Sequence, residues 1–348
     1  MLEKRLPSSF LKFLCVACAV CFIALFSLGA SQVDDQLTAR RRVFPSVGPG
    51  LRAIRHDANG KYYLLVSPST GVVVFDSHGK QLAAIGAAAL DSAANKSAGS
   101  AVMPGGANIA FGEDCDVDAQ GNILVADRGL NRVSVFSPDG NLLRSFHVNG
   151  PTSLAALPEG EVAVTTAREP HLIVVYGASG KVVREMGDPE SISTRDDLNR
   201  YLSIGRLASD SQNRLYYGFT YFPEPLVRQY DRYGYAGLDF QFTGLDAFPE
   251  AAAARKEIEH QEKKIQPPVF KPILTAFAVD PVNGEIWMCL HNTLLHFDKE
   301  GNRQSEYQIY IPSGARLEAT SILVEPDRLL IGSDPLGVYD FERPDRKH

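Results

Sequence analysis

The chain has 348 residues, 45% of them hydrophobic, and its 41 acidic and 35 basic side chains give a formal net charge of −6. A nucleic-acid surface needs clustered basic residues, and the basic stretches 40–42 and 255–264 are interpreted as solvated faces. The length allows a large core, which excludes a small domain held together by disulfides.

The N-terminus has the pattern of an export signal. Lys4, Arg5 and Lys12 give a positive start, residues 13–28 are almost entirely apolar, and residues 27–31 offer small side chains for cleavage. The apolar run is shorter than the roughly 20 residues that a membrane helix needs. We therefore predict a signal peptide over residues 1–31 and a periplasmic or extracellular protein. The alternative is an uncleaved N-terminal anchor, which would be the chain's sole contact with a membrane.

The rest of the chain repeats one pattern six times. The clearest copy, Asp116 to Phe146, has a glycine turn between two apolar runs and another glycine turn after them. Such turns need the positive φ that glycine supplies, and the runs have the length and composition of strands. The first turns of the copies are Asn59-Gly60, Gln120-Gly121, Glu159-Gly160, Gln212-Asn213, Asn283-Gly284 and Asp327-Arg328. The third strands end in aromatic residues, which we expect to fill the gaps between sheets: Phe75, Phe136, Tyr176, Tyr230, Phe297 and Phe341.

Repeated units of this kind stack, because one unit cannot bury its own faces. Four short strands per copy predict an all-β, six-bladed β-propeller that forms a single domain over residues 41–343. The last copy ends after its third strand, and segment 41–47 belongs to no copy. We predict that this N-terminal strand completes the sixth blade and closes the ring, since an open ring would expose unpaired edges. A β-sandwich or two smaller β-domains are the alternatives.

Copy two resembles an NHL repeat in its succession of a turn, NILVAD, RGLNR, VSVFSPDG and LLRSF. The other copies resemble that repeat mainly in their turns and aromatic ends, and the resemblance extends over residues 50–341. It implies a six-bladed propeller of the NHL or TolB-like kind, a class used as interaction platforms. Asp127 is interpreted as a loop cap that accepts local hydrogen bonds.

Two insertions interrupt the repeat. Residues 83–110 are rich in Ala, Gly and Ser and are expected to form a loop between blades one and two. Residues 250–265 predict a helix between blades four and five, because Ala, Glu and Lys dominate and prolines flank both ends. This helix is either a lid over the central channel or a surface decoration.

The two cysteines after the signal segment are predicted to be free thiols. Cys115 falls in the first strand of blade two and Cys289 in the second strand of blade five. Those blades lie opposite one another in a six-bladed ring, farther apart than the about 7 Å between Cα atoms that a disulfide can bridge.

A propeller usually binds its ligand at one mouth of the central channel, although this is an analogy between folds. The mouth is expected to consist of the loops that precede each first strand and those between second and third strands. Arginine and histidine are prominent there, which suits a ligand that carries a carboxylate or a sugar. The candidate ligand-binding residues are Asp114, Arg128, Arg168, His171, Arg206, Tyr221, Lys271, His291, Glu318 and Asp334.

No catalytic residue and no metal site are predicted. Asp114, Asp116 and Asp118 resemble the start of a calcium loop, but the glycine comes eighth rather than sixth and the twelfth position is Val125. Nucleophile-elbow and zinc-binding motifs do not occur in the mature sequence. Regucalcin and gluconolactonase relatives use the same architecture with a divalent metal in the channel, but their Pro-Asn-Gly signature is replaced here by residues 103–108.

The sequence therefore predicts an exported, non-catalytic binding or scaffold propeller that engages a small molecule or a protein, and no cofactor. The alternative is a metal-dependent, lactonase-like hydrolase or a lyase with its site in the channel. An amidating-lyase type of site would need several channel histidines, and only His171 and His291 are well placed.

Overall fold

The structure is a computed structural model that describes residues 35–68, 70–87, 108–241, 249–264 and 270–346. The chain divides into two units, Met1–Asp35 and Gln36–His348, and the description below concerns the second. The predicted signal peptide and most of the 83–110 insertion lie outside the described residues. Within the described part, no helix is long and apolar enough to cross a membrane.

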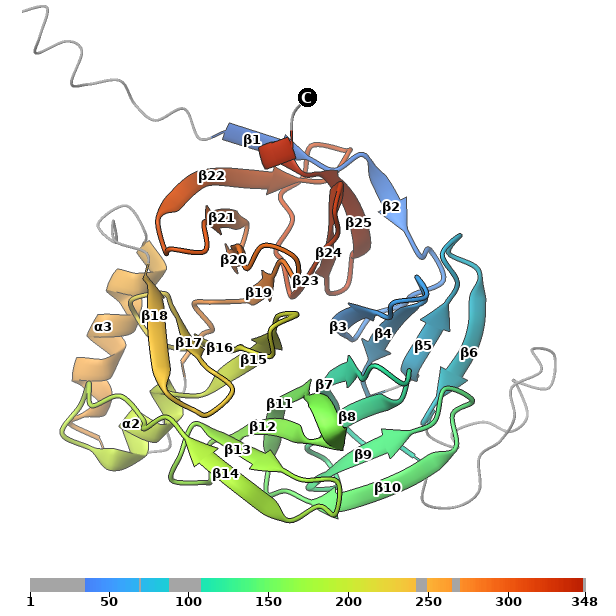
Figure 1. The fold of residues 1–348 in the computed structure, drawn as a ribbon. Coiled ribbons are helices and arrows are strands. Elements are labelled where there is room, and N and C mark those ends of the chain that lie inside the picture. The colour runs from blue at the N-terminus through green and yellow to red at the C-terminus, as the bar shows by residue number, and fades with distance from the viewer. Residues whose placement is uncertain (1–34, 69, 88–107, 242–248, 265–269, 347–348) are drawn as a thin grey trace, which may run out of the picture. The chain divides into compact units, whose positions relative to one another are not determined.

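The second unit is a ring of six antiparallel sheets, as predicted (Figure 1). Blade one consists of β3 (Leu51–His56), β4 (Tyr62–Val66), β5 (Gly71–Phe75) and β6 (Gln81–Ile85). Blade two consists of β7 (Gly112–Val117), β8 (Ile123–Asp127), β9 (Arg132–Phe136) and β10 (Leu142–His147). Blade three consists of β11 (Pro151–Ala156), β12 (Val162–Thr166), β13 (Ile173–Tyr176) and β14 (Val182–Met186).

Blade four consists of β15 (Gly205–Ser209), β16 (Leu215–Phe219), β17 (Leu226–Tyr230) and β18 (Ala236–Gln241). Blade five consists of β19 (Ala276–Val279), β20 (Ile286–Leu290), β21 (Thr293–Phe297), β22 (Arg303–Tyr310) and the N-terminal β1 (Asp35–Thr38). Blade six consists of β23 (Ser321–Val324), β24 (Arg328–Ser333), β25 (Gly337–Glu342) and β2 (Arg41–Val43). The first strand of each blade lines the centre of the ring (Figure 1).

The N-terminal segment closes the ring. β2 pairs antiparallel with β25, and Arg41 lies opposite Asp340. The strand ends at Val43, earlier than predicted, because Phe44 turns into the core with a φ of 51°. Its ring lies 5.2 Å from that of Tyr62 and 4.8 Å from that of Phe75, both in blade one. The segment therefore joins blade six to blade one, while β1 adds an outer strand to blade five that the sequence did not predict.

The six terminal aromatic residues fill the gaps between blades. Each is at most 7% exposed. Phe136, for example, shares a core cluster with Tyr63 and Leu65 of blade one, and Phe297 shares one with Tyr216 of blade four. The prediction that aromatic side chains seal adjacent sheets is confirmed, and both cysteines are buried and free.

The same aspartate hydrogen-bonding motif recurs in several turns. In blade two the Asp118 carboxylate accepts hydrogen bonds from the backbone N–H groups of Gln120 and Asn122, and Gly121 takes a φ of 79°. The carboxylate thus stands in for a turn of backbone. Asp118 serves the turn, as the repeat phase predicts. The same two-bond pattern occurs at Asp57, Asp76, Asp210, Asp231 and Asp298.

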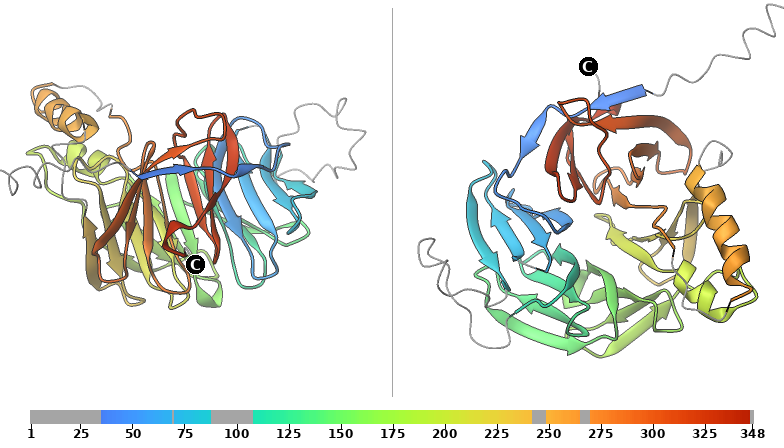
Figure 2. Two further views of the ribbon diagram at one scale, coloured as in Figure 1. Left: turned by 90° about the horizontal axis from the view of Figure 1, so that it is seen from above. Right: turned by 180° about the vertical axis from the view of Figure 1, so that it is seen from behind.

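The inserted helix, α3 (Pro249–Gln261), matches the predicted start but ends earlier. It packs against α2 (Asp196–Leu202), a short helix that the sequence did not predict, through Ile258 and Leu202. Arg195 donates a hydrogen bond of 2.6 Å to the carbonyl of Gln261 at the end of α3. Figure 2 shows α3 at the rim of the ring beside blade four, on one face and away from the centre.

Candidate ligand site in the central channel

The first strands place one equivalent residue from each blade in a layer across the channel. These residues lie opposite the penultimate residue of the neighbouring second strand in every blade. They are Ala53, Asp114, Ser153, Arg206, Ala276 and Ser321. The repeat therefore fixes the positions of the polar side chains in this layer.

Hydrogen bonds between blades run through this layer. Arg55 donates from Nη2 to Asp114 Oδ1 at 2.9 Å, which joins blade one to blade two. Ser153 donates its hydroxyl hydrogen to the other oxygen of Asp114, and the Leu207 N–H donates to Ser153 Oγ at 3.0 Å. The Ile54 N–H donates to Ser321 Oγ at 3.0 Å and joins blade one to blade six. Because Asp114 is only 3% exposed, its carboxylate lies buried within this layer.

A second carboxylate, that of Asp116, lies next to this layer. Asp116 Oδ1 lies 3.7 Å from Nε of Arg55, and Oδ2 accepts a hydrogen bond of 2.8 Å from the Ala156 N–H. Burial raises the pKa of Asp116 and the pKa of the neighbouring Cys115 thiol. Both groups therefore favour the uncharged form more than exposed counterparts would.

The layer divides the channel into two compartments. The smaller cavity, of about 20 Å³, is lined by Arg52, Arg55, Asp114, Arg206 and Ser321 among others. The larger, of about 570 Å³, opens at the ends of the first strands and is lined by residues from all six blades. Its wall is mostly apolar, with Leu154, Leu207, Phe277 and Ile322, and includes the polar residues Arg55, His56, Asp116 and Asp210. Arg55, Leu207, Phe277 and Ile322 line both cavities.

The large cavity opens at the mouth opposite the predicted one. The sequence-based candidates come from loops that precede first strands, whereas this cavity lies where those strands end. The first strands could have predicted this cavity. Small and apolar side chains near the ends of these strands leave room at that end of the channel.

β-Bulges shape the predicted mouth. The pairing of the first strand shifts by one residue at Arg52 in blade one, at Glu113 in blade two and at Thr152 in blade three. A bulge re-aims the side chain of the extra residue. Arg52 and Arg128 each place a guanidinium 5.3 Å from the ring centre of Phe111, and Arg128 forms an ion pair of 3.0 Å with Glu113.

Arg206 and Tyr221 lie together at the same mouth. Arg206 donates from Nη1 to the Thr320 carbonyl at 3.2 Å, across the channel from blade four to blade six. Burial raises the pKa of Tyr221 to about 12, and the neighbouring Tyr201 hydroxyl also raises it, while Arg206 lowers it. The Tyr201 and Tyr221 rings are 5.0 Å apart. Of the predicted residues, the structure thus brings Asp114 and Arg206 into the channel layer, whereas Tyr221 packs towards the α2 and α3 cluster.

The other predicted residues are spread over the loops. Arg168 donates to the Asn149 side chain at 3.2 Å, and His171 lies 3.2 Å from the exposed Asp188. Asp334 accepts a hydrogen bond of 2.9 Å from the Gly50 N–H, between blades six and one. His291 has a φ of 56°, and its buried Nε2 has no hydrogen-bond partner among the residues that the structure describes. Lys271 and Glu318 are exposed. Their role as ligand contacts stays a prediction.

The carboxylates of Asp114 and Glu113 already have partners in the protein. Asp114 is engaged by Arg55 and Ser153, and Glu113 by Arg128. Hard cations take several carboxylate or carbonyl oxygens, whereas Asp114 faces a guanidinium and a hydroxyl group and Glu113 faces a guanidinium. Asp127 is 0% exposed and accepts an N–H bond of 3.2 Å from Leu130, the local cap predicted from the sequence. It also accepts N–H bonds from Ala110 and Phe111, which are distant in the sequence.

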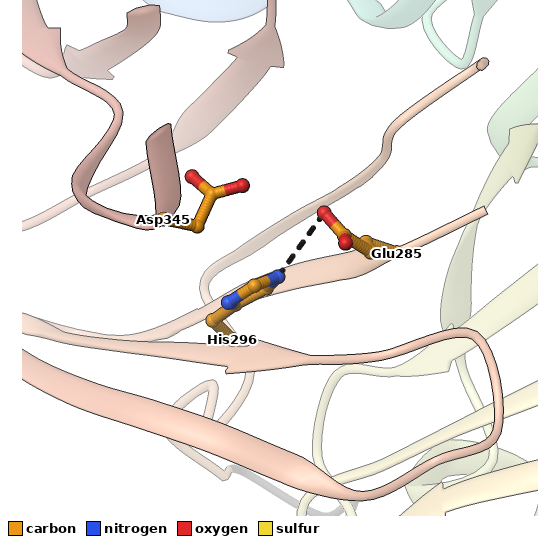
Figure 3. Close-up of side chains that lie close together, drawn as sticks. All are labelled: Glu285, His296 and Asp345. Atoms are coloured by element: carbon orange, nitrogen blue, oxygen red, sulfur yellow. Dashed lines mark ion pairs between the residues drawn. The ribbon is translucent and has the colours of Figure 1, made fainter. Parts of the chain in front are cut away.

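One group of potential metal ligands occurs among the described residues, away from the channel layer. Glu285, His296 and Asp345 place ligand atoms within 4.8 Å of one another (Figure 3). The Arg343 guanidinium is fully buried beside them, 3.1 Å from Glu285 and 2.8 Å from Asp345. The buried Arg343 thus already neutralises the two carboxylates of this cluster, which forms a salt-bridge network.

No protein-family model matches the sequence, and no curated protein matches it. Solved structures do match. A streptogramin B lyase shares 14% identity, with 87% of this chain and 86% of that chain covered and a TM-score of 0.52. A virginiamycin B lyase from Staphylococcus aureus shares 11%, with 87% and 98% covered and a TM-score of 0.52. A gluconolactonase from Xanthomonas campestris shares 15%, with 89% and 95% covered and a TM-score of 0.54.

At these identities the likeness shows the fold alone. The chain is a six-bladed β-propeller, and its structural neighbours include propeller enzymes. The resemblance of copy two to an NHL repeat stays a prediction.

Proposed function

We propose that this protein is a non-catalytic binding propeller that takes a small, largely apolar molecule into its central channel. The observation that carries the proposal is the cavity of about 570 Å³ that all six first strands line. Ligand pockets are typically concave, mostly apolar and of this size, with a few polar groups that orient the ligand. Here Arg55, His56 and Asp116 supply those groups.

A neutral, apolar fluorescent probe, N-phenyl-1-naphthylamine, tests the proposal. We expect saturable binding of one probe per chain and loss of that binding in Ala156→Phe, which fills the cavity from β11. Ala252→Phe is the matched control, because Ala252 is exposed on α3 outside the cavity. Absence of saturable binding, or binding that survives Ala156→Phe, would refute the cavity as the site.

The alternative is a metal-dependent, lactonase-like hydrolase or a lyase in the channel. Its support is the shared fold with a gluconolactonase and with streptogramin B and virginiamycin B lyases. The charged partners of Glu113 and Asp114 argue against a metal there. We expect the purified protein to hold no stoichiometric divalent metal. Retained calcium or zinc, together with lactone opening that Asp114→Asn abolishes, would establish the enzyme instead.

We also propose that the chain is exported, on the basis of the positive and apolar N-terminal segment. N-terminal sequencing of the protein from the periplasm or the medium should find a start near residue 32. An intact N-terminus in the membrane fraction would favour the anchor.

A further inference from the structure

We propose that Arg52 and Arg206 form an oxyanion site that binds the carboxylate of a small organic acid at the mouth predicted from the sequence. This site lies at the polar layer itself, which contributes Arg206, and it is a separate cavity from the large one. It therefore does not rest on the function proposed above, and the two can fail separately.

The first argument is the charge balance around the small cavity. Three guanidinium groups, those of Arg52, Arg55 and Arg206, line it together with one carboxylate, that of Asp114. Asp114 lies 2.9 Å from Arg55, which also approaches Asp116. Within the described ranges, no carboxylate lies within ion-pair distance of Arg52 or Arg206. Two of the three positive charges around this space therefore have no ion-pair partner among the described residues.

The second argument is the hydrogen-bonding capacity of Arg52. Its Nε is buried and has no hydrogen-bond partner in the described part of the chain. Its guanidinium lies against the Phe111 ring, which holds the side chain without using its N–H donors. A buried charged donor without a partner is costly, and a bound carboxylate would satisfy it.

The third argument is the arrangement of Arg206 and Tyr221. Arg206 donates one of its five N–H groups to the Thr320 carbonyl, and this hydrogen bond fixes the side chain across the channel. Tyr221 is neutral at pH 7, and burial raises its pKa further, to about 12. The mouth therefore offers a positioned guanidinium fork beside neutral aromatic groups, and an acid with a small ring or sugar body would fit against them.

The cavity can take at most one oxygen of an anion, so the geometry of the guanidinium groups must decide which anion binds. A space of about 20 Å³ holds about one water-sized group. A planar carboxylate can accept two parallel hydrogen bonds from a guanidinium fork, whereas a phosphate would bring additional oxygens into the same space.

The test compares acids with neutral analogues by thermal shift and calorimetry at matched ionic strength. The probes are acetate and glucuronate, with acetamide and glucose as neutral counterparts and with inorganic phosphate and chloride as free anions. We expect acetate and glucuronate to raise the melting temperature of the wild-type protein and the neutral probes to have no effect. Arg52→Gln and Arg206→Gln should weaken acid binding ~10- to 100-fold, and Arg232→Gln, an exposed arginine in an outer turn of blade four, should not.

A second measurement separates ligand binding from a structural role. Without ligand, Arg206→Met should keep or raise the melting temperature, because an unneutralised charge is removed, whereas Arg55→Met should lower it. If Arg206→Gln does not fold, Arg206→Lys keeps the charge, lacks the fork, and should also bind the acids more weakly.

Several results would overturn the assignment. These are no stabilisation by either acid, acid binding that survives both Gln variants, stronger stabilisation by phosphate or chloride than by the acids, or equal destabilisation in Arg206→Met and Arg55→Met. Naphthylamine binding that persists in the Gln variants would leave the function of the large cavity intact.

Discussion

The buried Arg343 offers the sharpest test of how the ring is held together. Its side chain is 0% exposed, and Nη1 donates to Asp280 Oδ2 at 2.6 Å and to the Glu325 carbonyl at 3.2 Å. Nη2 donates to Glu285 at 3.1 Å, and the guanidinium lies 5.7 Å from the Trp287 ring centre. The residue follows β25 of blade six, yet Asp280, Glu285 and Trp287 belong to blade five. It therefore fastens the C-terminus to the preceding blade.

Arg343→Met fills the space of the stem and removes the charge. Removing one partner of a buried ion pair typically costs about 3–5 kcal/mol, since the remaining carboxylates keep their burial and lose their counter-charge. We expect a loss of this size in the free energy of unfolding, measured by urea titration and followed by circular dichroism. The double variant Arg343→Met, Asp280→Leu should recover part of the loss, because the Asp280 carboxylate is then also absent.

The matched control is Arg40→Met. Arg40 forms an ion pair of 2.8 Å with Glu342, next to Arg343, but the two side chains are 48% and 56% exposed. Exposed ion pairs contribute little, so its unfolding midpoint should stay close to that of the wild type. A loss below about 1 kcal/mol in Arg343→Met, or an equal effect in Arg40→Met, would refute the reasoning.

Three further predictions concern the same unit. Phe44→Ala should cost about 3–5 kcal/mol in the free energy of unfolding, because the ring is 5% exposed between blades six and one; an unchanged urea midpoint would contradict that role. Cys115 and Cys289 should resist iodoacetamide in the native protein and react after denaturation, since burial raises both thiol pKa values; mass spectrometry of labelled peptides decides. Burial lowers the folded-state pKa of His296, so the unfolded state binds its proton more readily. That contribution is complete above about pH 6.5 and is lost as the pH falls towards the folded pKa, so the stability of His296→Gln should decline less between neutral and mildly acidic pH than that of the wild type.

The repeat made most of the fold predictable. Turn glycines, strand-length apolar runs and terminal aromatics are local signals that recur in phase, so the sequence indicated blade number and ring closure. β1 and α2 escaped prediction for a physical reason. Both are short, and β1 is stabilised by β22, a strand far away in the sequence, rather than by a pattern of its own.

The channel was harder to predict because its contacts join different blades. The sequence placed Asp114 and Arg206 near the axis, but the pairing of Asp114 with Arg55 depends on the distance between two neighbouring blades. The sequence did not predict Arg52 as a site residue, because regular alternation along a strand does not point its side chain into the channel. The β-bulge that redirects this side chain is visible only in the strand register.

The closure of the ring has a consequence for the order of assembly during synthesis. β2 leaves the ribosome first among the strands of its blade, and its partner β25 leaves last. Until β25 has emerged, β2 has no partner strand in its own blade, so the sixth blade cannot form before then. A chain truncated before residue 337 would leave both β2 and the edge of β24 open to pairing with other molecules.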